Sequence, residues 1–175
     1  MLRGEKTVVR ALEQEDLRTV WRWENDPRVM EHLWVDPTSY RAVEKYFEEK
    51  LSDNTTKWFL IEEAAGSKPI GVAWYYSLHG ADRCEVGIYL GELEYLGRGY
   101  GTDALTTFLR FLFDTKGLHR VGLSAAADNP RAIRAYEKCG FRHEGRLREH
   151  CLKKGGRVDL VNMGILRREF YGERA

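Results

Sequence analysis

Three glycines, Gly97, Gly99 and Gly101, alternate with other residues where a strand-like segment passes into a helix-like one. Before them, Cys84–Leu90 alternates with the period of a strand, and after them apolar residues recur with helical spacing over Ala104–Phe113. A strand, a glycine turn and a helix bring backbone N–H groups and the positive end of the helix dipole to one point. Because glycine has no Cβ, an anion can approach this backbone closely. The stretch predicts an anion-binding loop; the alternative is a turn that only caps the helix.

Two common phosphate-binding loops do not fit this pattern. A P-loop requires a lysine directly after its last glycine, and no lysine follows Gly101. The dinucleotide-binding fingerprint requires Gly-x-Gly-x-x-Gly early in a βαβ unit, whereas this chain has Gly-x-Gly-x-Gly, late in the sequence. The loop therefore has to be interpreted together with a second motif.

That second motif is Ala127–Phe141, which reads ADNPRAIRAYEKCGF. Together the two segments resemble the GNAT superfamily of N-acetyltransferases, which use acetyl-CoA. The family's phosphate loop, Gln/Arg-x-x-Gly-x-Gly/Ala, has the same frame as Leu96–Gly101, with Leu96 in place of the leading Gln or Arg. Residues 2–34 and 141–168 look most like the RimJ/RimL-type branch, which includes ribosomal-protein N-terminal acetyltransferases and polyamine acetyltransferases.

The resemblance implies that the strand end and the glycine loop bind the coenzyme. The backbone at the end of the strand would pair with the pantetheine amides as an added strand does, and the loop backbone would hold the diphosphate. Thr102 would cap the helix and touch phosphate. The coenzyme contacts implied in this way are Tyr89, Leu90, Gly91, Leu96, Gly97, Arg98, Gly99, Tyr100, Gly101 and Thr102.

Asn129 is a further coenzyme contact implied by the resemblance. An alternative role is that of a helix N-cap, because Pro130 follows it and suits the first helical position. Both roles are compatible, since an amide side chain offers a donor and an acceptor.

Glu85 is the candidate general base. The strand alternation places it on one face with Gly87 and Tyr89, and its separation from Gly99 is that at which histone-acetylating members of the superfamily carry their catalytic glutamate. A carboxylate in a partly apolar cleft has a raised pKa and can take the proton of an amine, through water. The alternative is a solvent-facing strand residue paired with Arg83.

Tyr136 is the candidate general acid. By resemblance it occupies the position of the family tyrosine that protonates the departing coenzyme A sulfur. A phenol with a pKa near 10 suits a thiolate leaving group. The alternative is an aromatic side chain that packs on the core, for instance with Ile133.

The order of the predicted elements indicates an α/β fold of the α+β type. We expect a mixed, mostly antiparallel central sheet with helices on both faces, in which the phosphate loop joins a strand to a helix. The predicted strands are Lys6–Leu12, Lys57–Glu62, Pro69–Leu78, Cys84–Leu90, His119–Ala125, Phe141–Leu152 and Arg157–Leu166. The predicted helices are Glu13–Glu24, Tyr40–Leu51, the helix after the glycine loop and Asn129–Lys138.

Length and composition predict one acetyltransferase domain over residues 1–175, because 43% hydrophobic and 12% aromatic residues suffice for one buried core. A net charge of +1 gives no drive toward nucleic acid or membranes. The absence of a signal peptide and of a long apolar run predicts a cytoplasmic protein with reduced thiols at Cys84, Cys139 and Cys151. Neither the cysteines nor the scattered histidines have metal-ligand spacing, so we expect no metal.

The acceptor is less defined than the coenzyme. A primary amine is expected, and a protein N-terminus of the ribosomal-protein type, a polyamine and an aminoglycoside remain open. The first two helices and the loop 28–36 are the expected wall of the acceptor site, although their aromatic residues also suit the core. An acidic cleft would favour a polycation, and the acidic residues of this region suit either a cleft or plain surface. These aromatic and acidic residues are Trp21, Trp23, Tyr46, Phe47, Glu24, Asp26, Glu31 and Asp36.

A function of another class is also compatible with the sequence. A non-catalytic acyl-CoA-binding module with a regulatory role would need the loop but neither Glu85 nor Tyr136, and Leu96 favours it weakly. The resemblance also suggests a homodimer, which the residues themselves do not indicate.

Overall fold

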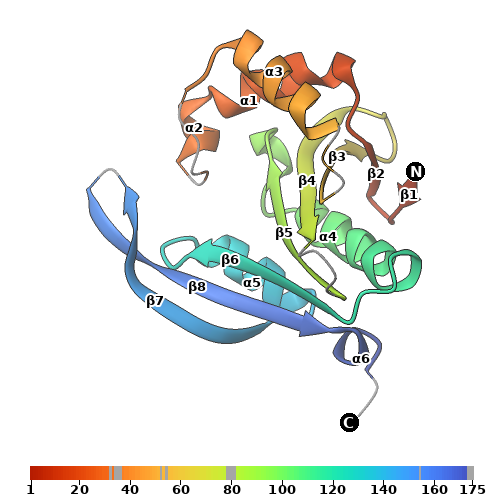
Figure 1. Ribbon diagram of the computed structural model, residues 1–175, viewed down its shortest axis with the longest axis vertical. Coiled ribbons are helices and arrows are strands. Elements are labelled where there is room, and N and C mark those ends of the chain that lie inside the picture. The colour runs from red at the N-terminus through yellow and green to blue at the C-terminus, as the bar shows by residue number, and fades with distance from the viewer. Residues whose placement is uncertain are drawn as a thin grey trace.

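One eight-stranded sheet organises the described residues in the computed structural model (Figure 1). The structure describes residues 1–31, 33, 37–51, 53, 55–77, 82–153 and 155–172. The strands lie in the order β1-β2-β3-β4-β5-β6-β8-β7. Their bounds are β1 (Leu2–Arg3), β2 (Thr7–Ala11), β3 (Thr56–Glu63), β4 (Pro69–Ser77), β5 (Arg83–Leu90), β6 (Arg120–Ala126), β7 (Arg142–Lys153) and β8 (Gly156–Leu166).

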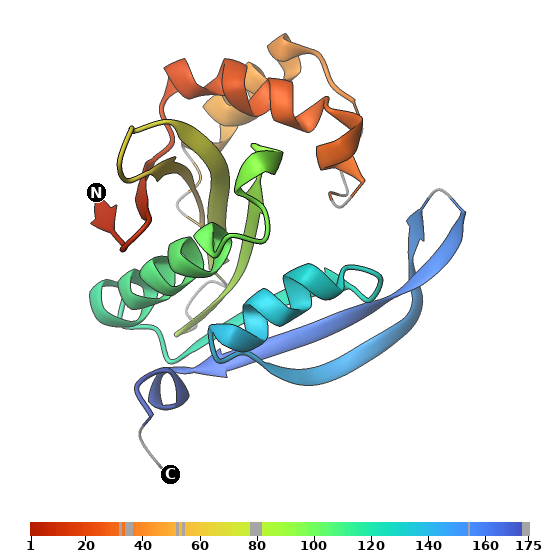
Figure 2. The ribbon, with the colours of Figure 1, turned by 180° about the vertical axis from the view of Figure 1, so that it is seen from behind.

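Helices cover both faces of the sheet, as the sequence predicts. In Figure 1 the three helices of the first third of the chain lie together beside β3, β4 and β5, and Figure 2 shows α4 and α5 in front of the opposite face. The helices are α1 (Leu17–Glu24), α2 (Pro27–Met30), α3 (Tyr40–Leu51), α4 (Tyr100–Arg110), α5 (Pro130–Lys138) and α6 (Arg167–Phe170). Shorter helical turns are η1 (Gln14–Asp16), η2 (Leu93–Tyr95) and the π-helical η3 (Phe111–Thr115).

The alternation along β5 divides its side chains between two cores. Val86, Ile88 and Leu90 face the larger core, to which α4 contributes fully buried residues such as Phe108. Tyr89 faces the smaller core beneath α1 and α3. The predicted two-faced strand is therefore confirmed, and the face that carries Glu85 and Tyr89 is the face covered by α1.

The first predicted helix differs from the structure at its start, while α1 ends at Glu24 as predicted. It begins with the 3₁₀ turn η1, because the Asp16 carboxylate accepts a hydrogen bond from the Glu13 amide at 2.9 Å and two from the Arg10 guanidinium. After it, Pro27 does not merely end the helix but begins α2, since the Asp26 side chain caps the Arg28 amide at 2.9 Å. The chain thus makes two short helices where one was expected.

Asp103 ties the start of α4 to the N-terminal segment. Its carboxylate accepts hydrogen bonds from the backbone amides of Glu5, Lys6 and Thr7 and from the Thr7 hydroxyl, at 2.6–3.0 Å. An acidic residue in the first helical turn also interacts favourably with the helix dipole. The Lys6 ammonium donates to the Arg98 carbonyl at 2.9 Å. These bonds hold the glycine loop in place from the side opposite to β5.

Candidate active site

The central strands β5 and β6 separate soon after they meet. They pair in parallel only between Arg83–Glu85 and Arg120–Gly122, and Figure 1 shows them diverging beyond that point. Among the described residues, the part of β5 beyond Glu85 therefore has no strand paired with it on its β6 side. Backbone groups that lack a strand partner can pair with an extended ligand.

The glycine loop lies at the open end of this divergence, between β5 and α4. Gly97 and Gly99 adopt φ values of 71° and 86°, in the left-handed region that glycine tolerates best. Gly99 is the N-cap of α4, so the first amides of the helix, which have no intrahelical partner, lie at the loop. The predicted strand, glycine turn and helix are therefore present, an arrangement that suits an anion.

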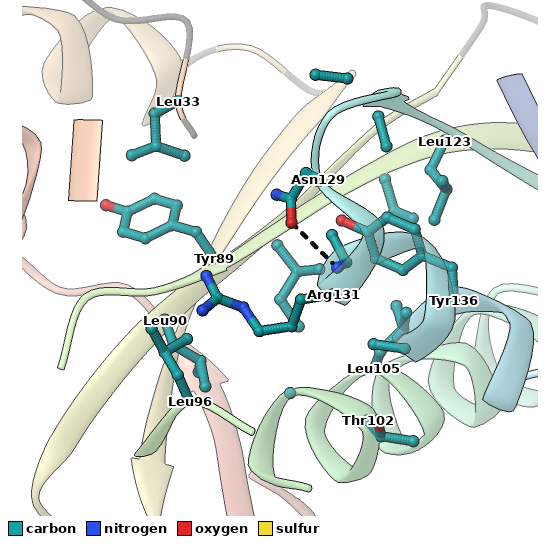
Figure 3. A pocket seen from close by; sticks show the side chains of 18 of the residues that line it. Leu33, Tyr89, Leu90, Leu96, Thr102, Leu105, Leu123, Asn129, Arg131 and Tyr136 are labelled. Atoms are coloured by element: carbon teal, nitrogen blue, oxygen red, sulfur yellow. Dashed lines mark hydrogen bonds between the residues drawn. The ribbon is translucent and has the colours of Figure 1, made fainter. Parts of the chain in front are cut away.

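A cavity of about 680 Å³ follows the divergence of the two strands. It brings together the two candidate catalytic residues and most of the candidate coenzyme contacts. The predicted residues that line it are Glu85, Tyr89, Leu90, Leu96, Gly97, Gly99, Gly101, Thr102, Asn129 and Tyr136. In Figure 3 the Tyr89 and Tyr136 side chains lie on opposite sides of this cavity.

Three other predicted contacts do not line the cavity. The Gly91 amide donates to the Ile70 carbonyl at 2.9 Å, so it is already paired. The Arg98 carbonyl accepts from Lys6. The Tyr100 ring packs edge-on against Tyr95 at 4.8 Å, away from the cavity. The alternation of the loop turns every second residue outward, which the motif alone does not reveal.

Glu85 lies at the closed end of the divergence, half-buried in the cavity lining. Its carboxylate lies across Gly122 of β6, where a Cβ atom would be 2.2 Å from Oε1. Burial raises the pKa of Glu85, Arg120 opposes the rise and Glu144 adds to it, with a smaller lowering effect from Arg83. A raised pKa makes the carboxylate a better proton acceptor near neutral pH.

Arg120 is engaged by a different carboxylate. Its guanidinium forms a two-pronged ion pair with Glu144 at 2.5 Å, over the Cα of Gly164. The hydrogen bonds from Arg120 lower the pKa of Glu144, whereas the pKa of Glu85 remains raised. Glu85 is thus near a cation without being ion-paired to it in the described part of the chain.

Tyr136 lines the cavity from α5 and also packs on the core. Its ring lies 6.2 Å from that of Phe141, so the core-packing interpretation is confirmed, while the acid role stays a prediction. Burial raises the pKa of Tyr136 to about 12, with a smaller contribution from Cys139. The phenol is therefore protonated at neutral pH and is able to donate, although it is a weaker acid than a free phenol.

Asn129 caps α5, as one of its two sequence-based roles requires. Its Oδ1 atom accepts a hydrogen bond from the Ala132 amide at 3.2 Å, drawn as the dashed line in Figure 3. The cap fixes the start of α5 beside the cavity. The second role, contact with the coenzyme, stays a prediction.

Three basic residues of α5 that were not predicted as site residues also line the cavity: Arg131, Arg134 and Lys138. Figure 3 shows the Arg131 side chain extending from α5 toward the Tyr89–Leu90 end of β5. Because they are separated by three and four residues, their side chains lie next to one another on a single face of α5. That spacing, read within the second motif, is the signal that could have identified them.

The expected acceptor wall is present in part. Arg28, Val29 and Leu33 line the cavity, while residues 32 and 34–36 lie outside the described residues. Trp23 is buried in the smaller core beside Tyr89. Trp23 therefore serves as core, and the described part of the wall comes from α2 and from Leu33 after it.

The four acidic residues of this region have different environments. Glu24 lines the cavity. The Asp26 carboxylate is bound by the Arg28 guanidinium at 2.6 and 3.0 Å. Glu31 is exposed and Asp36 lies outside the described residues. Of the acidic residues that the structure describes here, Glu24 is thus the one that faces the cavity.

Three further observations concern the described residues. No group of three or more His, Cys, Asp or Glu side chains among them is arranged to hold a metal ion. None of their helices has the length and apolar character needed to cross a bilayer. Cys84, Cys139 and Cys151 are buried and not disulfide-bonded.

Comparisons with known proteins agree with this site. Residues 6–142 match the model of the acetyltransferase (GNAT) domain family. The spermidine N(1)-acetyltransferase of Vibrio cholerae is 28% identical over 164 residues, covering 93% of this chain and 94% of that protein. That of Escherichia coli K12 is 27% identical over 166 residues, covering 94% and 88%.

A solved structure is also similar over nearly its full length. It is that of the spermidine N-acetyltransferase from Vibrio cholerae in complex with CoA and spermine, with a TM-score of 0.89 and 28% identity over 96% of this chain and 99% of that one. The mixed sheet, the glycine loop at the start of α4 and the match over residues 6–142 lead to one conclusion. This chain belongs to the GNAT family of N-acetyltransferases, enzymes whose co-substrate is acetyl-CoA.

Proposed function

We propose that this enzyme acetylates a primary amine of a polyamine such as spermidine. The observation that carries the proposal is the division of charge in the cavity. Basic residues line its α5 side, whereas Glu24 of α1 and Glu85 of β5 line the other side, and Arg28, which also lines the cavity, is bound to Asp26. A polyanionic coenzyme suits the first side and a polycation suits the second. The relatives named as spermidine acetyltransferases support the same choice.

The other acceptors have less support. A ribosomal-protein N-terminus carries one ammonium on a polypeptide, and it needs no second carboxylate deep in the cavity. The assignment to the RimJ/RimL-type branch also stays a prediction from the sequence. A non-catalytic acyl-CoA-binding module is disfavoured, because it needs no carboxylate of raised pKa opposite a protonated phenol.

The residues that line the cavity fit acetyl-CoA. The first amides of α4 and the loop glycines Gly97 and Gly99 suit the diphosphate. The guanidinium of Arg131, on α5 across the cavity, suits a phosphate group of the coenzyme. The unpaired β6-facing side of β5 at Tyr89 and Leu90 suits the pantetheine amides. Leu96, in place of Gln or Arg, leaves this binding to the backbone.

In the proposed mechanism Glu85 and Tyr136 move the protons. When bound, acetyl-CoA supplies an acetyl group activated as a thioester. Glu85 takes one proton from the acceptor ammonium, through water, so that the nitrogen lone pair can form the C–N bond. As the C–S bond breaks, the Tyr136 hydroxyl gives its proton to sulfur. Nitrogen loses two protons as the ammonium becomes an amide. Glu85 takes the first, and the second replaces the proton that Tyr136 gives to sulfur.

Three wider expectations accompany this proposal. We propose that residues 1–175 form a single catalytic domain, because all described strands join one sheet. The homodimer and the cytoplasmic location stay predictions from the sequence.

An amine panel tests the proposed acceptor. With acetyl-CoA and each amine in turn, we expect free-thiol release to show a kcat/KM for spermidine about tenfold or more above that for an aminoglycoside or an N-terminal peptide, equivalent to about 1.4 kcal/mol. The extra cationic centres of spermidine meet carboxylates on the sheet side. A preference for the peptide would overturn the polyamine assignment, and no thiol release with any amine would favour the non-catalytic alternative.

A substitution at Gly101 tests where the coenzyme lies. This glycine does not adopt a left-handed φ, and an added Cβ would have Leu90 Cδ1 as its nearest neighbour, at 3.9 Å. The family pattern allows alanine here, so the test uses the larger Gly101→Leu, whose side chain extends into the cavity where the diphosphate is expected. We expect the Kd for CoA by calorimetry to rise roughly tenfold. The Tm is expected to be little changed, because leucine favours helix over glycine.

The matched control is Gly145→Leu on β7. An added Cβ there has no atom within 4 Å, and Gly145 does not line the cavity of about 680 Å³. This variant should bind CoA as the wild type does. Equal CoA affinity in both variants would remove the start of α4 from the binding site.

A further inference from the structure

The second carboxylate of the cavity, Glu24, occupies an unfavourable position for an ionised group. It is the last residue of α1, where the negative end of the helix dipole repels an acidic side chain. It is half-buried, and its described partner is the Tyr89 hydroxyl, which donates at 3.2 Å. Burial raises the pKa of Glu24, and the Tyr89 hydrogen bond only partly opposes this. A carboxylate placed in this way is stabilised by a cation, which the described residues do not provide.

The charged residues around the cavity direct a cation to the sheet side. On α5 the basic residues repel it, and the Arg28 guanidinium at the entrance is already bound to Asp26. Two carboxylates then remain for an incoming ammonium. The charged lining residues are Glu24, Arg28, Glu85, Arg131, Arg134 and Lys138.

An aromatic surface lies between the two carboxylates. Trp74 of β4 pairs with Gly87 of β5, and its indole lies over that glycine, since an added Cβ would be 2.0 Å from the ring. Gly87 is midway between Glu85 and Tyr89 on the same face of β5. The indole of Trp74 also stacks on that of Trp58 at 4.8 Å, which fixes its orientation.

Along this face of the sheet lie the Glu85 carboxylate, the Trp74 indole and then Tyr89, whose hydroxyl holds the Glu24 carboxylate of α1. Glu85 and Tyr89 are separated by four positions on β5, so their Cα atoms lie about 13 Å apart at strand spacing. An extended chain of methylene groups can lie on the indole, and ammonium groups also interact favourably with aromatic faces. This row matches a linear molecule that carries an ammonium at each end.

We propose that Glu24 binds the distal ammonium of the acceptor and sets the enzyme's preference for linear di- and polyamines over monoamines, with Trp74 supporting the methylene chain. This inference rests on the proposed function, because it describes the acceptor half of the same cavity. Glu24 acts in specificity and takes no part in proton transfer. Tyr89 is a positioning residue, since its hydroxyl orients the Glu24 carboxylate.

The test compares two acceptors that differ only in the distal charge: 1,8-diaminooctane and 1-octylamine. For each enzyme the ratio of kcat/KM for the diamine to that for the monoamine is measured by thiol release. We expect Glu24→Gln to lower this ratio roughly tenfold or more, because one charge-assisted contact is lost. The glutamine side chain can still accept the Tyr89 hydrogen bond, so the fold is retained.

Glu31→Gln is the matched control, since Glu31 is an exposed glutamate of the same region that does not line the cavity. Its ratio should equal that of the wild type. An unchanged ratio in Glu24→Gln, with spermidine still acetylated by the wild type, would overturn the role of Glu24 alone. A wild type that does not acetylate spermidine and prefers 1-octylamine would overturn the polyamine function and this inference together.

Discussion

Glu85→Gln is expected to lower kcat at neutral pH by roughly 10²–10⁴, the usual size of a general-base contribution. The amide has the same shape and can lie across Gly122 as the carboxylate does, but it cannot take a proton. In the wild type, kcat/KM should fall as the pH drops through the pKa of Glu85, which burial raises above the ordinary glutamate range. Glu85→Gln should lose this acidic limb. Steady-state thiol release across a pH series measures both effects.

Glu15→Gln serves as the control for this experiment. Glu15 is an exposed glutamate in η1 that does not line the cavity, so its rate should stay within about twofold of the wild type. If Glu85→Gln keeps the acidic limb at the wild-type pH, another group takes the proton of the amine.

Phe108→Ala is expected to lower the free energy of unfolding by about 3–5 kcal/mol. Phe108 is fully buried in α4, and its ring contacts those of Phe59, Tyr75 and Phe111 at centroid distances of 5.0, 6.2 and 6.2 Å. Three facing rings from the sheet and the following turn cannot all move into the vacated space. Urea denaturation followed by circular dichroism should show a lower midpoint with an unchanged slope.

Leu152→Ala on β7 provides the contrast. Leu152 is 75% exposed, so its truncation should change the free energy of unfolding by less than about 0.5 kcal/mol. A loss below about 1 kcal/mol in Phe108→Ala would mean that α4 can repack, and that the position of the glycine loop does not depend on this core.

The parts of the fold that could be predicted from the sequence are those set by local pattern. The alternation of β5, the left-handed glycines Gly97 and Gly99, and the capped start of α5 at Asn129 each depend on neighbours in the chain. The short helix α2 was not predicted, because Asp26 and Pro27 can end one helix and begin another with the same residues.

The parts of the site that could not be predicted depend on contacts between distant segments. The hydrogen bond between Tyr89 and Glu24 joins β5 to α1, and the indole of Trp74 covers Gly87 only because β4 and β5 pair in that register. The place where β5 leaves β6 has no signature in either strand. For Glu85, the sequence indicated the candidate base but not that its carboxylate lies across Gly122.

The short parallel contact between β5 and β6 has a mechanical consequence. Only three residue pairs join the N-terminal and C-terminal portions of the sheet along this seam, so it is a weak joint in the backbone ladder. A pantetheine arm lying along β5 would extend the ladder beyond the point where the protein's own strands stop pairing. The coenzyme would then act as a missing structural part as well as a reactant, and its departure after each turnover would leave the seam open again.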